Sequence, residues 1–122
     1  MAGSSELTPI ELSRNAKVLR SAGKAVSDTA DLYVDCSGVD TSKLVFYFER
    51  DASAKNPTIK FVDGAQYTGG TIGDYTFATT ASGEYFAGPF ESHRFKDSNG
   101  YIKVRDSSAS TAVVTAYAIL LP

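Results

Sequence analysis

The sequence has one cysteine, one histidine and no tryptophan among its 122 residues. A single cysteine, Cys36, excludes an intrachain disulfide and a zinc site built from several cysteines, and we expect it to be a small buried apolar residue. The single histidine, His93, has no second histidine or cysteine nearby to complete a ligand set. We therefore expect no metal, no cofactor and no disulfide-stabilised secreted scaffold.

Long apolar runs and basic blocks are missing as well. No stretch approaches the ~20 apolar residues that cross a bilayer, and residues 1–6 have neither the basic nor the apolar region of a signal peptide. The formal net charge of −2 provides no general attraction to phosphate backbones or anionic lipid. We expect no nucleic-acid partner, no membrane partner, and synthesis in a reducing cytosol.

A catalytic arrangement is also lacking. Ser92 precedes His93, but adjacent strand residues point to opposite faces, and no other general base accompanies them. The glycines within 69–73 are not followed by the lysine and serine or threonine of a phosphate-binding loop. The aspartates between residues 28 and 40 lack the glycine and closing glutamate of a calcium loop. We therefore expect neither an enzyme nor a small-molecule substrate.

The chain does contain a regular series of short strand patterns from residue 30 onward. Seven or eight of them occur at the spacing of about 8 to 12 residues that is typical of an all-β sandwich or barrel, and no helix alternates with them. The expected strands are Ala30–Cys36, Leu44–Phe48, Thr58–Val62, Tyr75–Thr79, Glu84–Ala87, Tyr101–Val104 and Ala112–Leu120. The length suits a single domain, and the seven tyrosines and seven phenylalanines alternate as expected for core and sheet-face packing.

Several features predict how these strands connect. Leu44–Phe48 is a continuous aromatic run, which predicts a central strand covered on both sides, with Thr58–Val62 as its hairpin partner. The Asn-Gly pair within Asp97–Gly100 predicts a tight hairpin turn. The last segment, Thr111–Pro122, is apolar on both faces, which indicates a middle strand or one covered by a neighbouring subunit. We expect the chain to end inside its own core.

Residues 1–29 lack this strand pattern and are predicted to form an N-terminal arm beside the domain of residues 30–122. Thr8, Pro9 and Glu11 satisfy a helix-start pattern, so one or two helical turns are one alternative. The other is an extended, basic arm whose apolar residues need cover from outside the domain. The candidate partner-contact residues are Ile10, Leu12, Arg14, Lys17, Val18, Leu19 and Arg20.

The order of segments along the chain resembles that of a known family. The segments are Ile10–Ala16, Lys43–Glu49, Pro57–Phe61, Gly88–Lys96, Asn99–Ile102 and the terminal Leu121–Pro122. In this order they are similar to the small head proteins of tailed bacteriophages that decorate or cement the capsid exterior. The resemblance spans nearly the whole chain and rests on turn and packing residues.

This resemblance implies a β-sandwich or jelly-roll protein with an extended arm, which joins a pre-built icosahedral shell as a homotrimer and bridges neighbouring capsomers. Its partner would be the major capsid protein, and its location the outside of the virion. Two alternatives stay open: a phage head-tail or tail structural subunit, and a carbohydrate-binding β-sandwich module with a flat exposed aromatic patch. Removal of residues 1–20 is expected to leave the sandwich folded and to weaken attachment to capsids.

Overall fold

The structure is a computed structural model that describes residues 5–20, 23–26, 31–52, 57–62, 74–90, 95–106 and 114–122. Within these ranges the chain forms strands and one short 3-10 turn, η1 (Thr41–Lys43), and Phe95 is the one α-helical residue. The strands are β1 (Ser5–Glu6), β2 (Ile10–Glu11), β3 (Lys24–Ala25), β4 (Leu32–Asp35), β5 (Leu44–Arg50), β6 (Thr58–Phe61), β7 (Tyr75–Ala78), β8 (Glu84–Ala87), β9 (Tyr101–Asp106) and β10 (Val114–Leu120). The all-β prediction is confirmed.

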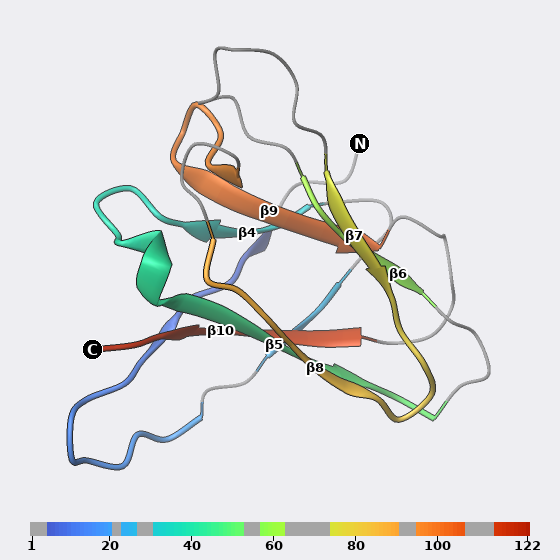
Figure 1. Ribbon diagram of the computed structural model, residues 1–122, viewed down its shortest axis with the longest axis horizontal. Coiled ribbons are helices and arrows are strands. Elements are labelled where there is room, and N and C mark those ends of the chain that lie inside the picture. Colours follow the sequence, from blue (N-terminus) through green and yellow to red (C-terminus); the bar gives the residue numbers. More distant parts are fainter. Residues whose placement is uncertain are drawn as a thin grey trace.

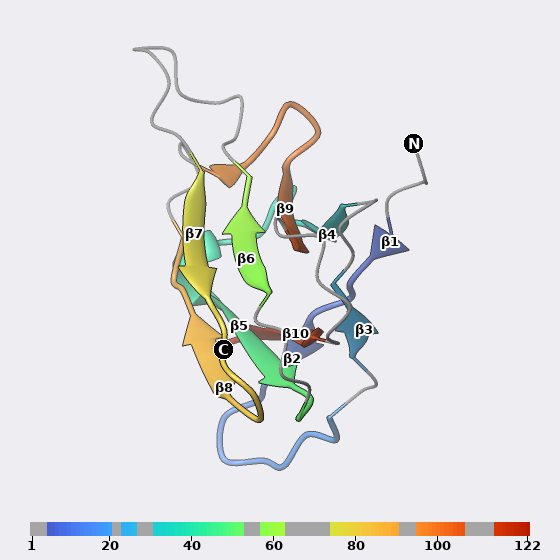
Figure 2. The same cartoon turned by 90° about the vertical axis from the view of Figure 1, so that its right-hand side faces the viewer.

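The strands form two sheets that face each other as a β-sandwich (Figures 1 and 2). The first sheet has the order β1-β4-β9-β6-β7, and the second has the order β2-β10-β5-β8, with β3 also paired to β10. β1 pairs with β4 and β2 with β10 in parallel, whereas the other pairs are antiparallel. β7 and β8 thus end their sheets on one side of the sandwich.

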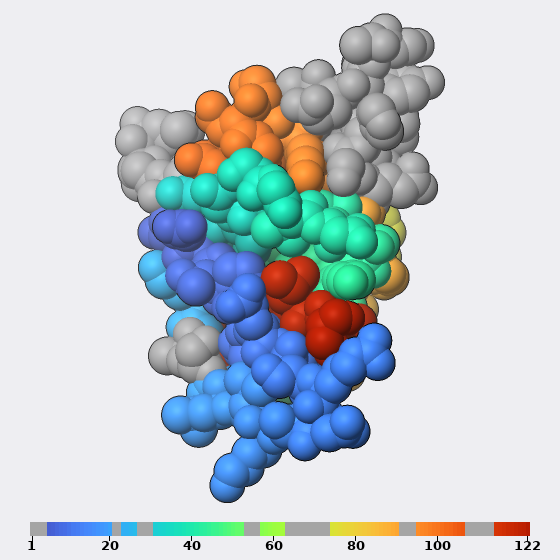
Figure 3. Space-filling view, turned by 90° about the vertical axis from the view of Figure 1, so that its left-hand side faces the viewer, coloured from blue at the N-terminus to red at the C-terminus, as the bar shows by residue number. Residues whose placement is uncertain are grey.

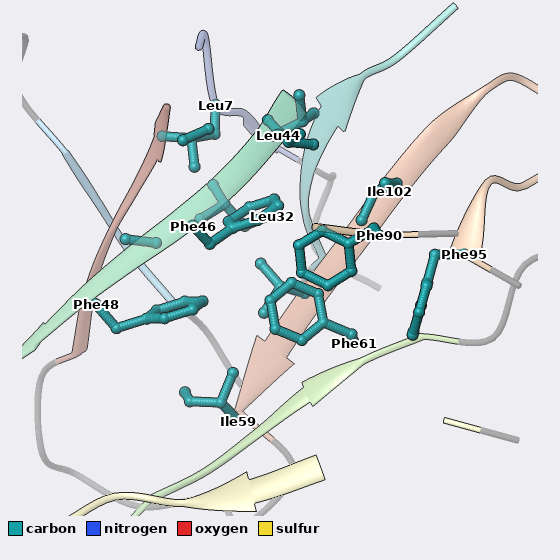
Figure 4. Close-up of a cluster of buried hydrophobic side chains, with 14 of the residues drawn as sticks. Leu7, Leu32, Leu44, Phe46, Phe48, Ile59, Phe61, Phe90, Phe95 and Ile102 are labelled. Atoms are coloured by element: carbon teal, nitrogen blue, oxygen red, sulfur yellow. The ribbon is translucent and has the colours of Figure 1, made fainter. Parts of the chain in front are cut away.

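The core lies between the sheets because the inward positions of the facing strands are apolar. Every second residue of β5, starting at Leu44, is buried, and the same alternation occurs in β6 and β9. Phe61 on β6 is in ring contact with Phe46 on β5, with centroids 5.1 Å apart, and with Phe90 at 4.7 Å. Figure 4 shows these rings pointing into the space between the sheets.

The predicted hairpin between β5 and β6 is wrong, because the two strands lie in different sheets. β5 pairs with β10 and β8, whereas β6 pairs with β9 and β7. Both strands carry large apolar side chains at alternate positions, and these meet across the core rather than within one sheet. β5 is a central strand as predicted, but only one face is in the core, since Val45, Tyr47 and Glu49 on the other face are half-buried.

The turn at Asp97–Gly100 forms, but not as a hairpin between two strands. The Gly100 N–H donates to the Asp97 carbonyl at 3.0 Å, and Gly100 has a φ of 82°, which glycine adopts without strain. β9 follows the turn and pairs with β4 and β6 on its two sides. Both edges of β9 are therefore paired with strands distant in sequence. Before the turn, the Asp97 N–H donates to the Tyr101 carbonyl at 2.9 Å, but the described residues 95–97 are not a strand.

β10 is a middle strand, as one of the two predicted alternatives required. β5 lies along one edge, and β2 and β3 share the other edge. Val114, Ala116 and Ala118 face the core. The expectation that the chain ends inside the core is wrong, because the residues that follow β10, Leu121 and Pro122, are exposed.

The N-terminal residues are extended and partly built into the sandwich. No residue within 5–20 is helical, so the helical alternative is wrong for this segment. The Leu7 side chain is 3% exposed and belongs to the core, and Ile10, beside Ile119, is 9% exposed. Strand addition buries these side chains, whereas a short isolated helix with a thin apolar stripe is only marginally stable. The prediction that Ile10 needs cover from outside the domain is therefore wrong.

Candidate functional site

The segment Leu12–Arg20, which we call the tip, is exposed along its whole length. The chain leaves the second sheet after β2, which runs parallel to β10, and returns through β3, which runs antiparallel to it. The Leu12 N–H donates to the Leu120 carbonyl at 2.9 Å, and the Val26 N–H donates to the Val114 carbonyl at 2.8 Å. In Figure 3 the segment extends from the lower end of the molecule. The tip is therefore anchored to β10 on both sides.

Six of the seven candidate contact residues are exposed on the tip, and only Ile10 is buried. Leu19 is 91% exposed, and Val18 and Leu12 are the other exposed apolar residues of the segment. Arg14 and Lys17 are also exposed and add positive charge. An exposed leucine beside basic side chains suits a protein contact better than a stabilising role within this chain.

Two of the seven candidates, Ile10 and Arg20, contact the sandwich itself. Arg20 Nη1 donates to Glu49 Oε1 at 2.9 Å, and the guanidinium lies 4.6 Å from the centre of the Tyr117 ring. Tyr117 is only 6% exposed although it points away from the core. Arg20 therefore attaches the C-terminal end of the tip to the sandwich. The other exposed side chains of the tip remain accessible to a partner protein.

Gly23 allows the chain to return this close to β10. A Cβ atom at this position would lie 2.7 Å from the Ala116 carbonyl oxygen and 2.7 Å from Tyr117 Cε2. Real Cβ atoms do not approach backbone so closely, so any larger residue would push β3 away from the sheet. The sequence alone did not distinguish this glycine from the others, because its role depends on the distant strand β10.

A row of three aromatic side chains crosses the outer face of the second sheet. Tyr47 is directly opposite Tyr117 on one side and Phe86 on the other, with ring centroids 5.6 Å and 5.0 Å apart. The Tyr47 hydroxyl donates to Glu84, and this hydrogen bond raises the pKa of Tyr47. Phe86 ends the row and is 74% exposed.

These three rings do not form the flat patch that the carbohydrate-binding alternative requires. Tyr117 is 6% exposed and Tyr47 is half-buried, so that Phe86 is the one ring of the three that is largely accessible. Sequence reasoning assigned the aromatics to core and sheet-face packing, but it did not find this row. The register that aligns residues 47, 86 and 117 comes from pairings between strands remote in sequence.

A surface cavity of about 350 Å³ adjoins the open end of this row. Its walls include Phe86 and Tyr75 from the end strands of the two sheets, together with Pro89, Phe90 and Phe95. Phe86 and Tyr75 are among the exposed large apolar side chains of the described chain. The cavity is therefore an aromatic hollow on the side of the molecule where β7 and β8 end the sheets.

The predicted lack of a metal site stays a prediction. Among the described residues, no three His, Cys, Asp or Glu side chains gather as a metal would require. Asp31 forms an ion pair with Arg105 at 2.6 Å, and Asp35 and Asp40 each accept hydrogen bonds from a serine two positions later. His93 and Ser92, Asp28 and the glycines at 69–73 lie outside the described residues.

Cys36 is buried as predicted, with no exposed surface. Burial raises the pKa of its thiol to about 11. At pH 8 about one thiol in a thousand is then ionised, against roughly a quarter in an unfolded chain. We expect a disulfide reagent to label Cys36 at pH 8 only when denaturant unfolds the protein. Rapid stoichiometric labelling of the folded protein would contradict this environment.

Comparisons with known proteins add no family assignment. No family model, no curated protein and no solved structure matches the chain. In the part of the chain that the structure describes, no helix has the length and apolar character needed to span a membrane.

Proposed function

We propose that this protein is a structural virion protein of a tailed bacteriophage, a capsid decoration or cement protein. It binds the major capsid protein on the outer surface of the shell, acts as a homotrimer, and stabilises the head by bridging capsomers. Two kinds of support are combined here. The order of sequence segments resembles that family, and the tip presents exposed apolar and basic side chains.

The observation that carries this proposal is the exposure of Leu19 on a segment that is fixed at both sides. Leu12 at the start of the tip and Val26, after β3, donate hydrogen bonds to β10, and Arg20 contacts Glu49 and Tyr117. A segment that is ordered before binding loses less conformational entropy when it docks. Leu19 supplies the apolar contact, and Arg14 and Lys17 favour an acidic capsid surface.

Truncation of residues 1–20 would not separate attachment to capsids from folding of the sandwich. It would remove Leu7 and Ile10, which are buried, together with the β1 and β2 pairings. The truncation is therefore expected to destabilise the sandwich as well as to remove the tip. Point substitutions on the tip separate attachment from folding.

We expect Leu19→Ala combined with Lys17→Glu to weaken attachment to capsids about tenfold or more. The double change removes an exposed apolar anchor and reverses a charge that faces the shell. Occupancy is measured by electron microscopy and by co-sedimentation with capsids assembled from the major capsid protein of the same virus. The charge contribution should shrink at high salt, because exposed charges are screened.

Lys43→Glu provides the matched control for charge. Lys43 is exposed in η1, outside the tip, so its reversal changes the net charge equally without touching the proposed contact. Full occupancy by the tip double variant, or equal weakening by Lys43→Glu, would refute the assignment of attachment to the tip.

A further inference from the structure

In the described part of the chain, an aromatic ring and a carboxylate together hold the guanidinium of Arg20. Arg20 stacks over Tyr117 at 4.6 Å, and the same guanidinium donates to Glu49 at 2.9 Å. The negative face of the ring and the carboxylate oxygens both attract the cation, and the planar guanidinium satisfies both at once. This filled position ends the aromatic row at the β10 side.

The β8 side of the same row offers the same two groups. Phe86 is directly opposite Tyr47, and Glu84 is directly opposite Glu49, so β8 repeats the aromatic and carboxylate pair of β5 in register. Tyr47 contacts the Phe86 ring with centroids 5.0 Å apart, and Phe86 remains 74% exposed. Among the described residues, the one cation over an aromatic ring is Arg20 over Tyr117.

The charges at the β8 end of the aromatic row favour the binding of a cation. Glu49 and Glu84 are like charges at paired positions, and such pairs repel. Arg20 forms an ion pair with Glu49, whereas Glu84 accepts a hydrogen bond from the neutral hydroxyl of Tyr47. A positive charge beside Glu84 would relieve this repulsion as Arg20 does beside Glu49.

We propose that Phe86 and Glu84 form a binding site for the guanidinium group of an arginine presented by a partner protein. The guanidinium stacks on the exposed ring of Phe86 and donates to Glu84, which extends the row by one position beyond β8. Residues next to that arginine fill the aromatic hollow formed by Tyr75 and its neighbours. The site lies on the opposite edge of the second sheet from the tip, so it goes beyond capsid attachment through the tip.

The test is a titration of the full-length isotope-labelled protein, followed by NMR, with a capped tripeptide that has arginine between two glycines. We expect shifts of the β8 amides with a weak dissociation constant, on the order of 10 mM at low salt. The same tripeptide with citrulline keeps the shape but lacks the charge, and it should produce almost no shift. The lysine tripeptide should bind more weakly, because an ammonium does not stack.

Two variants and one control test the residues. Phe86→Ala and Glu84→Gln should each weaken binding about two- to fivefold. Both side chains are exposed, and unchanged core amide shifts would show that the fold is retained. Leu121→Ala alters an exposed apolar residue after β10 that belongs to neither proposed site, and it should leave binding unchanged.

Three results would overturn the proposal. The first is that the citrulline peptide shifts the β8 amides as much as the arginine peptide does. The second is that Phe86→Ala binds the arginine peptide as tightly as the parent protein. The third is that Phe86→Ala has a lower solution mass than the parent protein, which would show that a second copy of this chain covers the site. None of these measurements involves capsids, so a negative result for the arginine site would leave the proposal of capsid attachment through the tip unaffected.

Discussion

Phe61→Ala is expected to lower the free energy of unfolding by about 3–5 kcal/mol. Phe61 is fully buried between the sheets, where its ring contacts Phe46 and Phe48 from the opposite sheet and Phe90. Truncation removes these contacts and leaves a cavity that the surrounding strands cannot fill, because both sheets are fixed by backbone hydrogen bonds. Urea unfolding followed by circular dichroism measures the loss.

Phe86→Ala is the matched control, since it makes the same chemical change at a side chain that is 74% exposed. We expect a change within about 0.5 kcal/mol for this variant. The pair therefore separates burial between the sheets from aromatic character as such. Similar losses in the two variants would contradict the placement of Phe61 at the centre of the core.

The strands were predictable because their signal is local. In β5 and β6, large apolar side chains recur at every second position, and this period is visible without knowledge of the partner strand. The pairing of the strands was not predictable in the same way. The hairpin interpretation joined β5 to β6 because they are neighbours in sequence, whereas a sandwich places them in opposite sheets to bury both apolar faces.

The candidate site was partly predictable for a related reason. Leu19 and the basic residues around it have no strand pattern, and the structure leaves six of the seven candidates exposed. Ile10 was misjudged because its partner, Ile119, is at the other end of the chain, and a parallel pairing of that span leaves no local mark. The position of Arg20 over Tyr117 and the alignment of Phe86 with Tyr47 depend on register, which only the folded sheet supplies.

The anchoring of the tip connects the fold to the proposed function. β10 lies in the middle of the second sheet. The edge of β10 that does not pair with β5 pairs with β2 and β3, the strands on either side of the tip. An N-terminal segment fixed to the sandwich in this way would transmit force from a capsid contact directly into the sheet. A flexible arm would instead lose entropy on docking and transmit less of that force. The N-terminal residues should therefore contribute to the stability of the domain.

Leu7→Ala tests that conclusion, and we expect it to lower the free energy of unfolding by about 2–5 kcal/mol. The Leu7 side chain is 3% exposed and packs in the core cluster, while its N–H donates to the Tyr33 carbonyl at 2.7 Å. Leu19→Ala makes the same change at a side chain that is 91% exposed, and it should leave stability within about 0.5 kcal/mol of the parent. Urea unfolding of the two variants under identical conditions gives the comparison. A freely hanging N-terminal arm would make the two substitutions equally harmless, and that outcome would remove the physical basis for a pre-ordered tip.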